Sequence, residues 1–332
     1  MAYYRLERRT KMNSKNTKKL FTTPWFVVSA AILCAILWGS AFPVLKLSYP
    51  ELGLQPDDLY GKVVFAGFRF LLASIIIFVF FKLTTKESIR VSKKYWLPLL
   101  GLGTLQTGLQ YFFFYNGLAH TTGMKGSIIE SIGNFFTVAL AHFFYSNDKL
   151  NTKKWIGMGT GLLGIIIVNW GQEFGWSFSF RGEGFLIICS ILSAIATIWA
   201  KEFSLNLHPI LINAWQMFLG SILLLLFGLP NVEPGFMTFT PFATGLFIYS
   251  ALLSSVAFSL WYTLLKYNKA GEIALFRFII PVAGAILSAL FIPGEAFTFG
   301  IVISLILVSV GIVLLNFPNK NNAITTVKSS PR

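Results

Sequence analysis

The sequence predicts an all-α integral membrane protein in which ten transmembrane helices form two inverted five-helix repeats. Hydrophobic residues make up 55% of the 332 residues and charged residues only 12%, whereas a soluble domain carries roughly 25% charge. The chain also repeats itself, because one gap-free register at an offset of 147 residues places Tyr115 on Tyr262 and Ile132 on Ile279. In addition, most basic residues lie in short segments between long apolar runs.

Ten apolar stretches define the expected helices. A bilayer core of about 30 Å is crossed by about 20 apolar residues in a helix. These runs are long and do not alternate as strands would, so helices are predicted. In chain order the predicted spans are 26–47, 60–82, 96–118, 124–146, 154–171, 183–203, 209–229, 240–265, 271–292 and 298–317.

The repeat covers both halves of the chain. The register at 147 residues extends over about a hundred residues and also aligns Asp148 with Glu295. Because each copy holds five segments, an odd number, the second copy inserts upside down, which is typical of transporters. We predict repeat 1 over 26–171 (helices 1–5), repeat 2 over 183–317 (helices 6–10), a basic cytoplasmic tail at 1–24 and a polar cytoplasmic tail at 318–332.

The first two segments fit a different offset. Residues 32–36 resemble residues 191–195 at an offset of 159, so the loop around 51–58 is about twelve residues longer than its counterpart. We interpret the extra residues as an ordinary surface insertion. A substrate-gathering lid is the alternative.

Basic residues set the predicted orientation. With the amino terminus inside, the inner segments hold 21 Lys and Arg and the outer segments hold 4. This bias places both termini in the cytoplasm and predicts a multi-pass protein of the cell membrane. The net charge of +14 forms no basic stripe interleaved with stacking aromatics, so nucleic acid is not an expected partner.

Short motifs follow one another in a fixed order along the spans. They are Leu37-Trp38-Gly39-Ser40-Ala41-Phe42 in the first span, Phe68-Arg69-Phe70 with Ala73 in the second, Asp148-Lys149-Leu150 after the fourth and Gly294-Glu295 after the ninth. This ordered set resembles the EamA-type transporters of the drug/metabolite transporter superfamily over about 26–317. The resemblance implies export of small molecules across the cytoplasmic membrane. It also implies a central cavity lined by helices 1, 3, 4, 6, 8 and 9.

One position departs from the family pattern. The ninth span contains Pro281, as the family often does, whereas the equivalent residue of the fourth span is Asn134. Proline removes a backbone donor and kinks a helix. We therefore expect the fourth helix to be straighter, with an amide that faces the cavity.

Three ionisable residues stand out within the predicted spans, namely Arg69, Glu130 and Arg277. Such groups cost about 2.5–3.5 kcal/mol each on insertion scales and are functional candidates. Glu130 and Arg277 are equivalent in the repeat, but in an inverted arrangement their depths would differ by roughly 12 Å. Depth therefore favours Arg69 as the partner of Glu130 in a structural ion pair.

Two alternatives stay open for these charges. Glu130 is also a candidate to carry a proton or to bind a cationic group, because a carboxyl in a low-dielectric cavity can exchange its proton near neutral pH. Arg277 either snorkels towards the inner surface or holds an anionic substrate group such as a carboxylate.

Polar and aromatic residues collect on the spans that the resemblance places at the cavity. An aromatic stripe is usually packing, although an apolar lining with few polar groups also suits amphipathic small molecules. Together with Glu130 and Arg277, the predicted substrate-binding residues are Trp38, Ser40, Gln110, Tyr111, Tyr115, Asn134, Trp199, Trp261 and Tyr262.

These features predict a secondary transporter that works by alternating access. Its cargo is expected to be an amino acid or related metabolite, and proton coupling is left open. An exporter of drugs or aromatic cations is the alternative. A membrane-embedded enzyme would need clustered carboxylates, His or Cys near an interface, and ATP would need a phosphate-binding loop; the sequence shows neither.

We therefore expect no enzyme activity, no cofactor and no metal. The predicted partners are a small-molecule substrate and the lipid bilayer. The glycine run of Gly157, Gly161 and Gly164 marks close helix packing, which includes a homodimer face as one use.

Overall fold

Every predicted span coincides with helical backbone in the part of the chain that the structure describes. The structure is a computed structural model that describes residues 16–55, 57–85, 87–121, 123–168, 170, 178–293 and 296–316. The Gly294-Glu295 motif and most of both predicted tails lie outside these residues. Seven spans are single helices: α2 (Pro24–Glu51), α3 (Leu59–Thr84), α6 (Gly123–Phe144), α7 (Thr152–Val168), α9 (Pro209–Gly228), α10 (Pro241–Tyr267) and α13 (Phe299–Asn316).

Three spans change helix type along their length. A π-helical turn inside an α-helix is uncommon and is frequent at functional sites. The third span is α4 (Trp96–Gly103), the π-helix η2 (Thr104–Leu109) and α5 (Gln110–Ala119). The sixth is the π-helix η3 (Phe180–Gly184) with α8 (Phe185–Asn206), and the ninth is α11 (Ala270–Ala274), the 3₁₀-helix η5 (Leu275–Phe278) and α12 (Ile279–Phe291).

Proline and capping residues account for several helix starts. Proline begins α2, α9 and α10, where its missing N–H has no helical partner to lose. Asp58 caps α3 by accepting from the Gly61 N–H at 2.8 Å, and Thr240 caps α10 by accepting from Ala243 at 3.0 Å.

The fourth and ninth spans differ as their sequences suggest. The 3₁₀-helix η5 ends three residues before Pro281, whereas α6 runs without interruption through Asn134. Proline cannot donate to the carbonyl four residues earlier, which here belongs to Arg277. The loss of this bond explains why the tighter turn lies just before Pro281.

Length and hydropathy mark many of these helices as membrane-crossing. Among the described residues, six helical segments are long and apolar enough to cross a bilayer. Shorter apolar helices are Ile129–Phe144 and Phe299–Leu314. The six are Pro24–Glu51, Leu59–Thr84, Phe180–Asn206, Pro209–Asn231, Pro241–Tyr267 and Ala270–Phe291.

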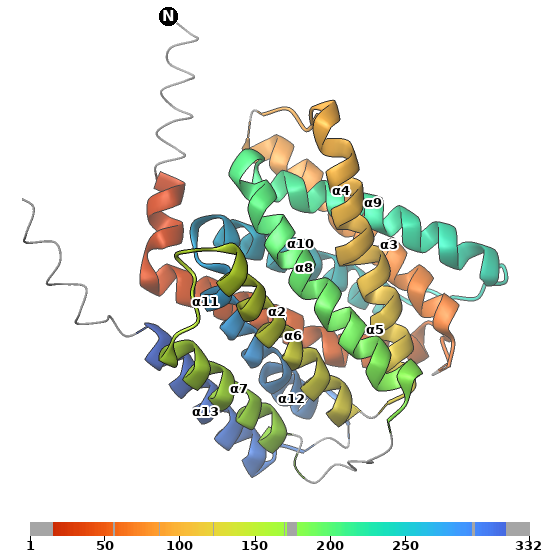
Figure 1. The fold of residues 1–332 in the computed structure, drawn as a ribbon. Coiled ribbons are helices and arrows are strands. Elements are labelled where there is room, and N and C mark those ends of the chain that lie inside the picture. Colours follow the sequence, from red (N-terminus) through yellow and green to blue (C-terminus); the bar gives the residue numbers. More distant parts are fainter. Residues whose placement is uncertain are drawn as a thin grey trace, which may run out of the picture.

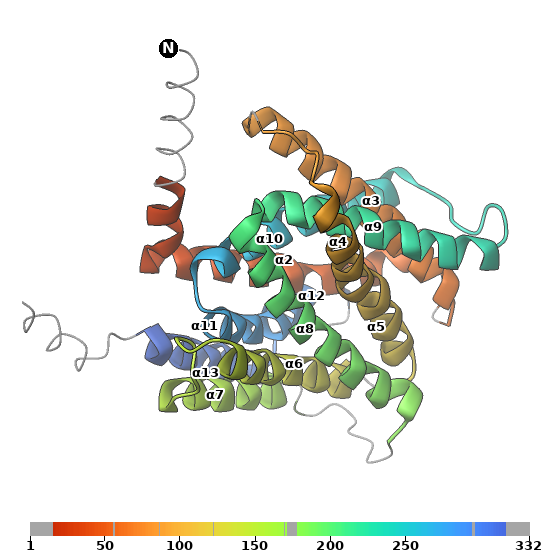
Figure 2. The same cartoon turned by 45° about the horizontal axis from the view of Figure 1, so that its top comes forward.

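Helix packing follows a two-fold pattern between the halves of the chain. α3 packs along α9, and α7 packs along α13, as Figures 1 and 2 both show. The contact of α6 with α8 has its counterpart in that of α12 with α2. The contact of α5 with α8 likewise corresponds to that of α10 with α2. Each of these contacts corresponds to the other when every helix is replaced by its equivalent in the other half of the chain.

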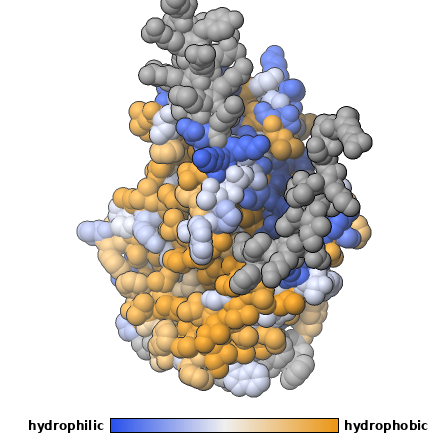
Figure 3. All heavy atoms as spheres, turned by 90° about the vertical axis from the view of Figure 1, so that its left-hand side faces the viewer, coloured by the Kyte–Doolittle hydropathy of each residue, from blue (hydrophilic) through white to orange (hydrophobic). Residues whose placement is uncertain are grey.

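Both described ends of the chain lie on one side of the molecule. In Figure 1, α2 begins and α13 ends at the left. Figure 3 views the molecule from that side and shows a hydrophobic surface below a hydrophilic patch. Exposed large side chains of α7 and α13, including Leu163, Ile306 and Val313, are suited to contact lipid tails.

A buried ion pair joins the loop after α6 to the start of α7, and its carboxylate also binds the start of α11. Lys154 Nζ lies 2.5 Å from Asp148 Oδ1, and both side chains are 1% exposed. The ammonium also donates to the carbonyls of Asp148 at 2.9 Å and of Lys149 at 3.0 Å. Asp148 Oδ2 accepts from the Gly271 N–H at 2.8 Å and so caps α11. One carboxylate therefore fixes three chain segments.

Candidate functional site

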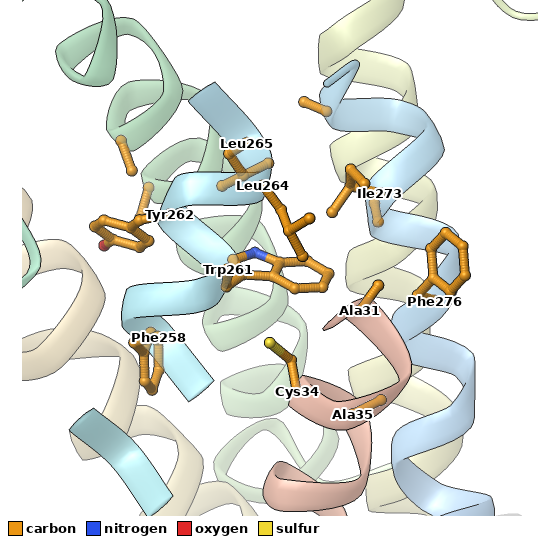
Figure 4. Close-up of a cluster of buried hydrophobic side chains, with 14 of the residues drawn as sticks. Ala31, Cys34, Ala35, Phe258, Trp261, Tyr262, Leu264, Leu265, Ile273 and Phe276 are labelled. Carbon is orange, nitrogen blue, oxygen red and sulfur yellow. The ribbon is translucent and has the colours of Figure 1, made fainter. Parts of the chain in front are cut away.

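An aromatic cluster fills the contact between α2 and α10. The Trp38 ring meets Phe258 and Trp261 edge-on, with centroids 5.1 Å apart in both cases. Figure 4 shows the Trp261 indole pointing towards Cys34 and the start of α2, while Tyr262 points to the opposite side of α10. Small residues of α2 leave room for the large indole, so Trp261 is only 3% exposed. Two predicted lining residues, Trp38 and Trp261, are thus in contact.

A second cluster surrounds Arg69 on α3. The guanidinium lies over the Phe70 ring at 4.4 Å and over the Tyr111 ring at 5.8 Å. Tyr111 in turn lies 6.0 Å from Tyr115, ring to ring. Arg69 also acts electrostatically on Tyr49, which interacts with Tyr115. α3, α5 and the end of α2 thus bring one cation and three phenols together.

A third cluster joins Glu130 of α6 to Arg277 of η5. Their charges act on each other, and Tyr111 and Cys189 lie within the same electrostatic neighbourhood. Arg277 Nη1 lies 3.3 Å from the Ser193 hydroxyl of α8. Within the described residues no direct ion pair joins Glu130 to Arg277, so the two charges interact without direct contact.

The ion pair of Arg69 with Glu130 stays a prediction that the contacts of the described residues do not support. Among the described residues, no ion pair or hydrogen bond joins them, and Tyr111 interacts electrostatically with both. The reason is which helices lie side by side. α3 packs against α9, α10 and α5, whereas α6 packs against α8, α11 and α7. Depth placed the two side chains at one level, but helix packing separates them.

Buried amides and hydroxyls form a chain across three helices. Thr107 of η2 donates to Gln216 Oε1 at 2.8 Å, Gln216 donates to Asn213 at 3.1 Å, and Asn213 donates to Ser259 of α10 at 3.1 Å. Thr107, Gln216 and Asn213 are at most 1% exposed. These bonds satisfy polar groups that would otherwise be costly in a membrane.

Other predicted residues lie around these clusters. Ser40 shares a hydrogen bond of 2.8 Å with Tyr249, and Gln110 accepts from Gln106 at 2.8 Å. Asn134 is 3% exposed on α6. Trp199 packs between Phe203, with ring centroids 5.8 Å apart, and the backbone at Gly101. Trp199 therefore contributes to the α8–α4 contact.

Several buried polar atoms in this region lack a hydrogen-bond partner among the described residues. Around the clusters these atoms are Trp38 Nε1, Tyr49 OH, Arg69 Nε, Tyr115 OH and Tyr262 OH. Buried polar groups are nearly always satisfied in native structures, so each exception needs a reason. A transported polar ligand, or water in its place, would supply the missing partners.

Sequence reasoning missed some members of the site. Tyr49 lies just beyond the predicted end of the first span, in the region where the two copies lose their common offset. Cys189, a lone thiol within the sixth predicted span, lies in the electrostatic neighbourhood of Glu130 and Arg277. The repeat did carry a signal for Gln216, because it occupies the position of Arg69 in the second copy.

The glycine run of α7 is used inside the chain. A Cβ at Gly161 would meet the Phe278 ring at 2.5 Å, and one at Gly164 would meet Val308 at 3.0 Å. α7 therefore packs closely on η5 and α13, and a dimer face does not follow from these glycines. Across the described residues, no group of three or more His, Cys, Asp or Glu side chains could hold a metal ion.

Comparison with known proteins decides the family. The model of the EamA-like transporter family matches residues 25–170 and, separately, residues 180–317. The chain belongs to the EamA-like transporter family. It is accordingly a multi-pass membrane protein of a transporter family, with the bilayer as its surroundings and small molecules as the class of cargo.

Relatives within this family have similar lengths. An uncharacterized transporter of Archaeoglobus fulgidus is 28% identical over 259 residues, which cover 76% of this chain and 85% of the relative. YvbV of Bacillus subtilis, also named an uncharacterized transporter, is 25% identical over 288 residues, or 86% of this chain and 90% of its own. One crystal structure superposes with a TM-score of 0.69 over 91% of this chain at 14% identity, which shows the fold alone.

Proposed function

We propose that this EamA-like protein is a secondary transporter that exports a small metabolite across the cytoplasmic membrane by alternating access. The observation that carries the proposal is the exchange pattern of the helix contacts. Several of the main contacts between the halves of the chain have a counterpart with the two roles reversed, as for α6 with α8 and α12 with α2. Two packings of nearly equal energy are what a molecule needs to open first to one side and then to the other.

The separate family matches support two structural repeats, one in each half. Five spans in each repeat imply that the second is inverted, which brings the total to ten. The count of 21 basic residues in predicted inner segments against 4 in outer ones supports cytoplasmic termini. The shared side of the two described chain ends in Figure 1 agrees with an even number of spans.

The central residues suit a transport site. Arg69 and Arg277 lie in helical segments long enough to cross a bilayer, and Glu130 lies in the shorter apolar helix Ile129–Phe144. Ionisable groups within such helices mark substrate or ion pathways. Tyr115, Trp261 and Tyr262 are at most 5% exposed, so the site is closed in this structure. An amino acid or related metabolite is the proposed cargo, because Glu130 and Arg277 could take its two opposite charges. A drug or aromatic cation exporter is the alternative, which the aromatic lining supports.

Flux measurements test the transport proposal. The purified protein in proteoliposomes should move labelled solutes from a panel of amino acids, aromatic cations and nucleosides, with and without a pH gradient. Empty liposomes and a variant with both halves cross-linked at the α6–α11 end serve as controls. Absence of flux for every solute in properly inserted protein would overturn the proposal.

Glu130→Gln tests whether this carboxyl carries the coupled proton. Because Glu130→Gln keeps the size of the side chain and Arg277 keeps its contact with Ser193, we expect the variant to fold, and its abundance is measured beside its flux. We expect it to lose the stimulation of flux by a pH gradient. Glu272→Gln is the matched control, since Glu272 is 37% exposed and pairs with Lys269 at 2.9 Å. Unchanged pH stimulation in Glu130→Gln would reject the role.

A further inference from the structure

The Arg69 guanidinium is a buried cation without a counter-ion in the described part of the chain. The side chain is 3% exposed. It has no ion pair or hydrogen bond with a described residue, and its Nε is one of the buried atoms without a partner. A charge in this position is strongly disfavoured unless something compensates it. The nearest groups are the Phe70 and Tyr111 rings, which stack on the guanidinium plane without neutralising it.

Two further unsatisfied donors lie in the same place. The hydroxyls of Tyr49 and Tyr115 are buried and lack hydrogen-bond partners among the described residues. Arg69 acts electrostatically on Tyr49, and the Tyr49 and Tyr115 side chains also act on each other, although their hydroxyls do not reach the geometry of a hydrogen bond. The Tyr111 ring, 6.0 Å from Tyr115, lies beside the guanidinium as well. Three donors from α2, α3 and α5 therefore converge, and no acidic residue of the described chain serves them.

The neighbouring charged residues do not neutralise the positive charge of Arg69. Glu130, the acidic residue within the central spans, interacts electrostatically with Arg277 rather than with Arg69. In the second repeat, Gln216 stands at the position of Arg69 and has both ends of its amide bonded inside the protein. The unpaired cation thus belongs to the first repeat. At the equivalent position of the second repeat, the side chain is neutral and its hydrogen bonds are satisfied.

We propose that Arg69, Tyr49 and Tyr115 bind the anionic group of the transported substrate, which is an organic anion with a planar apolar body. The guanidinium would hold a carboxylate through two parallel N–H donors, and the phenols would donate to its remaining lone pairs. The aromatic faces of Phe70 and Tyr111 would contact the apolar part. This inference rests on the proposed transport function, because it names the substrate class of the same central site.

Paired probes of one shape test the proposal. Labelled benzoate and benzylamine share a phenyl ring and differ in the sign of their charge. We expect the parent protein in proteoliposomes to favour benzoate, and Arg69→Gln to lower benzoate flux more than tenfold while benzylamine flux changes less than twofold. Arg69→Lys should recover part of the benzoate flux, because it restores the charge without the two-pronged geometry. Arg90→Gln, at an exposed arginine outside the spans, is the matched control.

A binding readout separates this inference from the transport proposal. Benzoate, compared with chloride at equal ionic strength, should raise the melting temperature of the detergent-purified parent protein but not that of Arg69→Gln. Protection by benzoate without flux of any solute would overturn transport and leave the anion site standing. Flux of other solutes with equal benzoate responses in parent and Arg69→Gln would overturn the anion site.

Two conservative variants guard against a folding defect at Arg69. Tyr49→Phe and Tyr115→Phe each remove one hydroxyl donor and keep the ring. Each should weaken benzoate protection several-fold, while the melting temperature without benzoate stays close to that of the parent protein. If both variants respond to benzoate as the parent protein does, the three-donor site is rejected.

Discussion

Two buried cations of this chain have opposite surroundings. Lys154 is 1% exposed and donates to a carboxylate and two carbonyls. Arg69 is 3% exposed and has no acceptor among the described residues. Because a buried charge without a partner is costly, the protein alone accounts for Lys154 but not for Arg69. The first cation holds the fold together, and the second has the properties expected of a binding group.

Gln216 makes the comparison closer, because it shares its repeat position with Arg69. α3 and α9, which carry these two residues, pack along each other. Gln216 accepts from Thr107 and donates to Asn213, so its amide is satisfied. At two positions related by the offset of 147 residues, the chain thus has one structural polar residue and one unsatisfied cation. This difference points to a functional role for Arg69, whose hydrogen-bonding groups are not satisfied by the described residues.

The largest effect should follow from breaking the satisfied pair. Lys154→Met leaves Asp148 buried with its Gly271 contact but without its cation. We expect the free energy of unfolding to fall by about 3–5 kcal/mol. Thermal unfolding in detergent measures the change.

The control for this variant is Lys269→Met, at an ion pair whose side chains are 44% and 37% exposed. We expect that change to stay within about 0.5 kcal/mol, because exposed pairs contribute little. Equal melting temperatures for Lys154→Met and the parent protein would contradict a structural role for the buried pair.

A smaller loss is expected from Gln216→Leu. This change leaves the Thr107 hydroxyl and the Asn213 amide without their partner, although the volume of the side chain is nearly kept. Stranding buried polar groups costs about 1–3 kcal/mol. The melting temperature should fall accordingly, while the preference between benzoate and benzylamine stays as in the parent. Gln55→Leu, at an exposed loop residue, is the control.

Much of the fold could be predicted from the sequence because membrane helices are specified locally. Long apolar runs and the positions of Lys and Arg predict the segments, and helical backbone covers each of them. The change of helix type at Leu275–Phe278 follows from Pro281. The π-helix at Thr104–Leu109 has no comparable signal, since the segment contains no proline and packs against α9, a neighbour that the sequence does not identify.

The charged site was harder to predict because it depends on lateral helix order. Depth along a helix can be counted from the sequence, and it placed Arg69 level with Glu130. Which helices are neighbours cannot be counted, and α3 does not pack beside α6 in the manner that the ion pair requires. Tyr49 was missed for a related reason, since its importance arises only from the approach of α2 to α3 and α5.

A pH-dependent effect is expected at His208, which precedes α9. Burial, and then the neighbouring Lys266, lower the pKa of His208 to about 4, from about 6.5 in an unfolded chain. Both states are neutral above pH 7. Between pH 6.5 and 4 only the unfolded state takes up the proton, so stability falls as the pH falls. The loss should reach at most about 2 kcal/mol at pH 5.

Melting temperatures at pH 7.5 and 5 measure this effect. His208→Gln should remove the part of the acid sensitivity that His208 causes. Relative to the parent protein, its melting temperature should therefore be higher at pH 5 than at pH 7.5. His120→Gln, at an exposed histidine, should not. An unchanged difference between parent and His208→Gln across this pH range would show that the histidine is not held neutral by its surroundings.

The smallest change in stability is expected where the cation is unpaired. Arg69→Met removes a buried charge and leaves no protein acceptor stranded, because none of the described residues bonds to the guanidinium. We expect the free energy of unfolding to change by less than about 1 kcal/mol. Arg277→Met is the contrast, since it takes away the cation that faces Glu130 and should lower the melting temperature clearly. A loss at Arg69 as large as that of Lys154→Met would mean that both cations are structural. If Arg69→Met is as stable as the parent protein but no longer binds benzoate, the roles of the two cations differ. The substitution would then have removed a contact with the ligand and no contact that stabilises the fold.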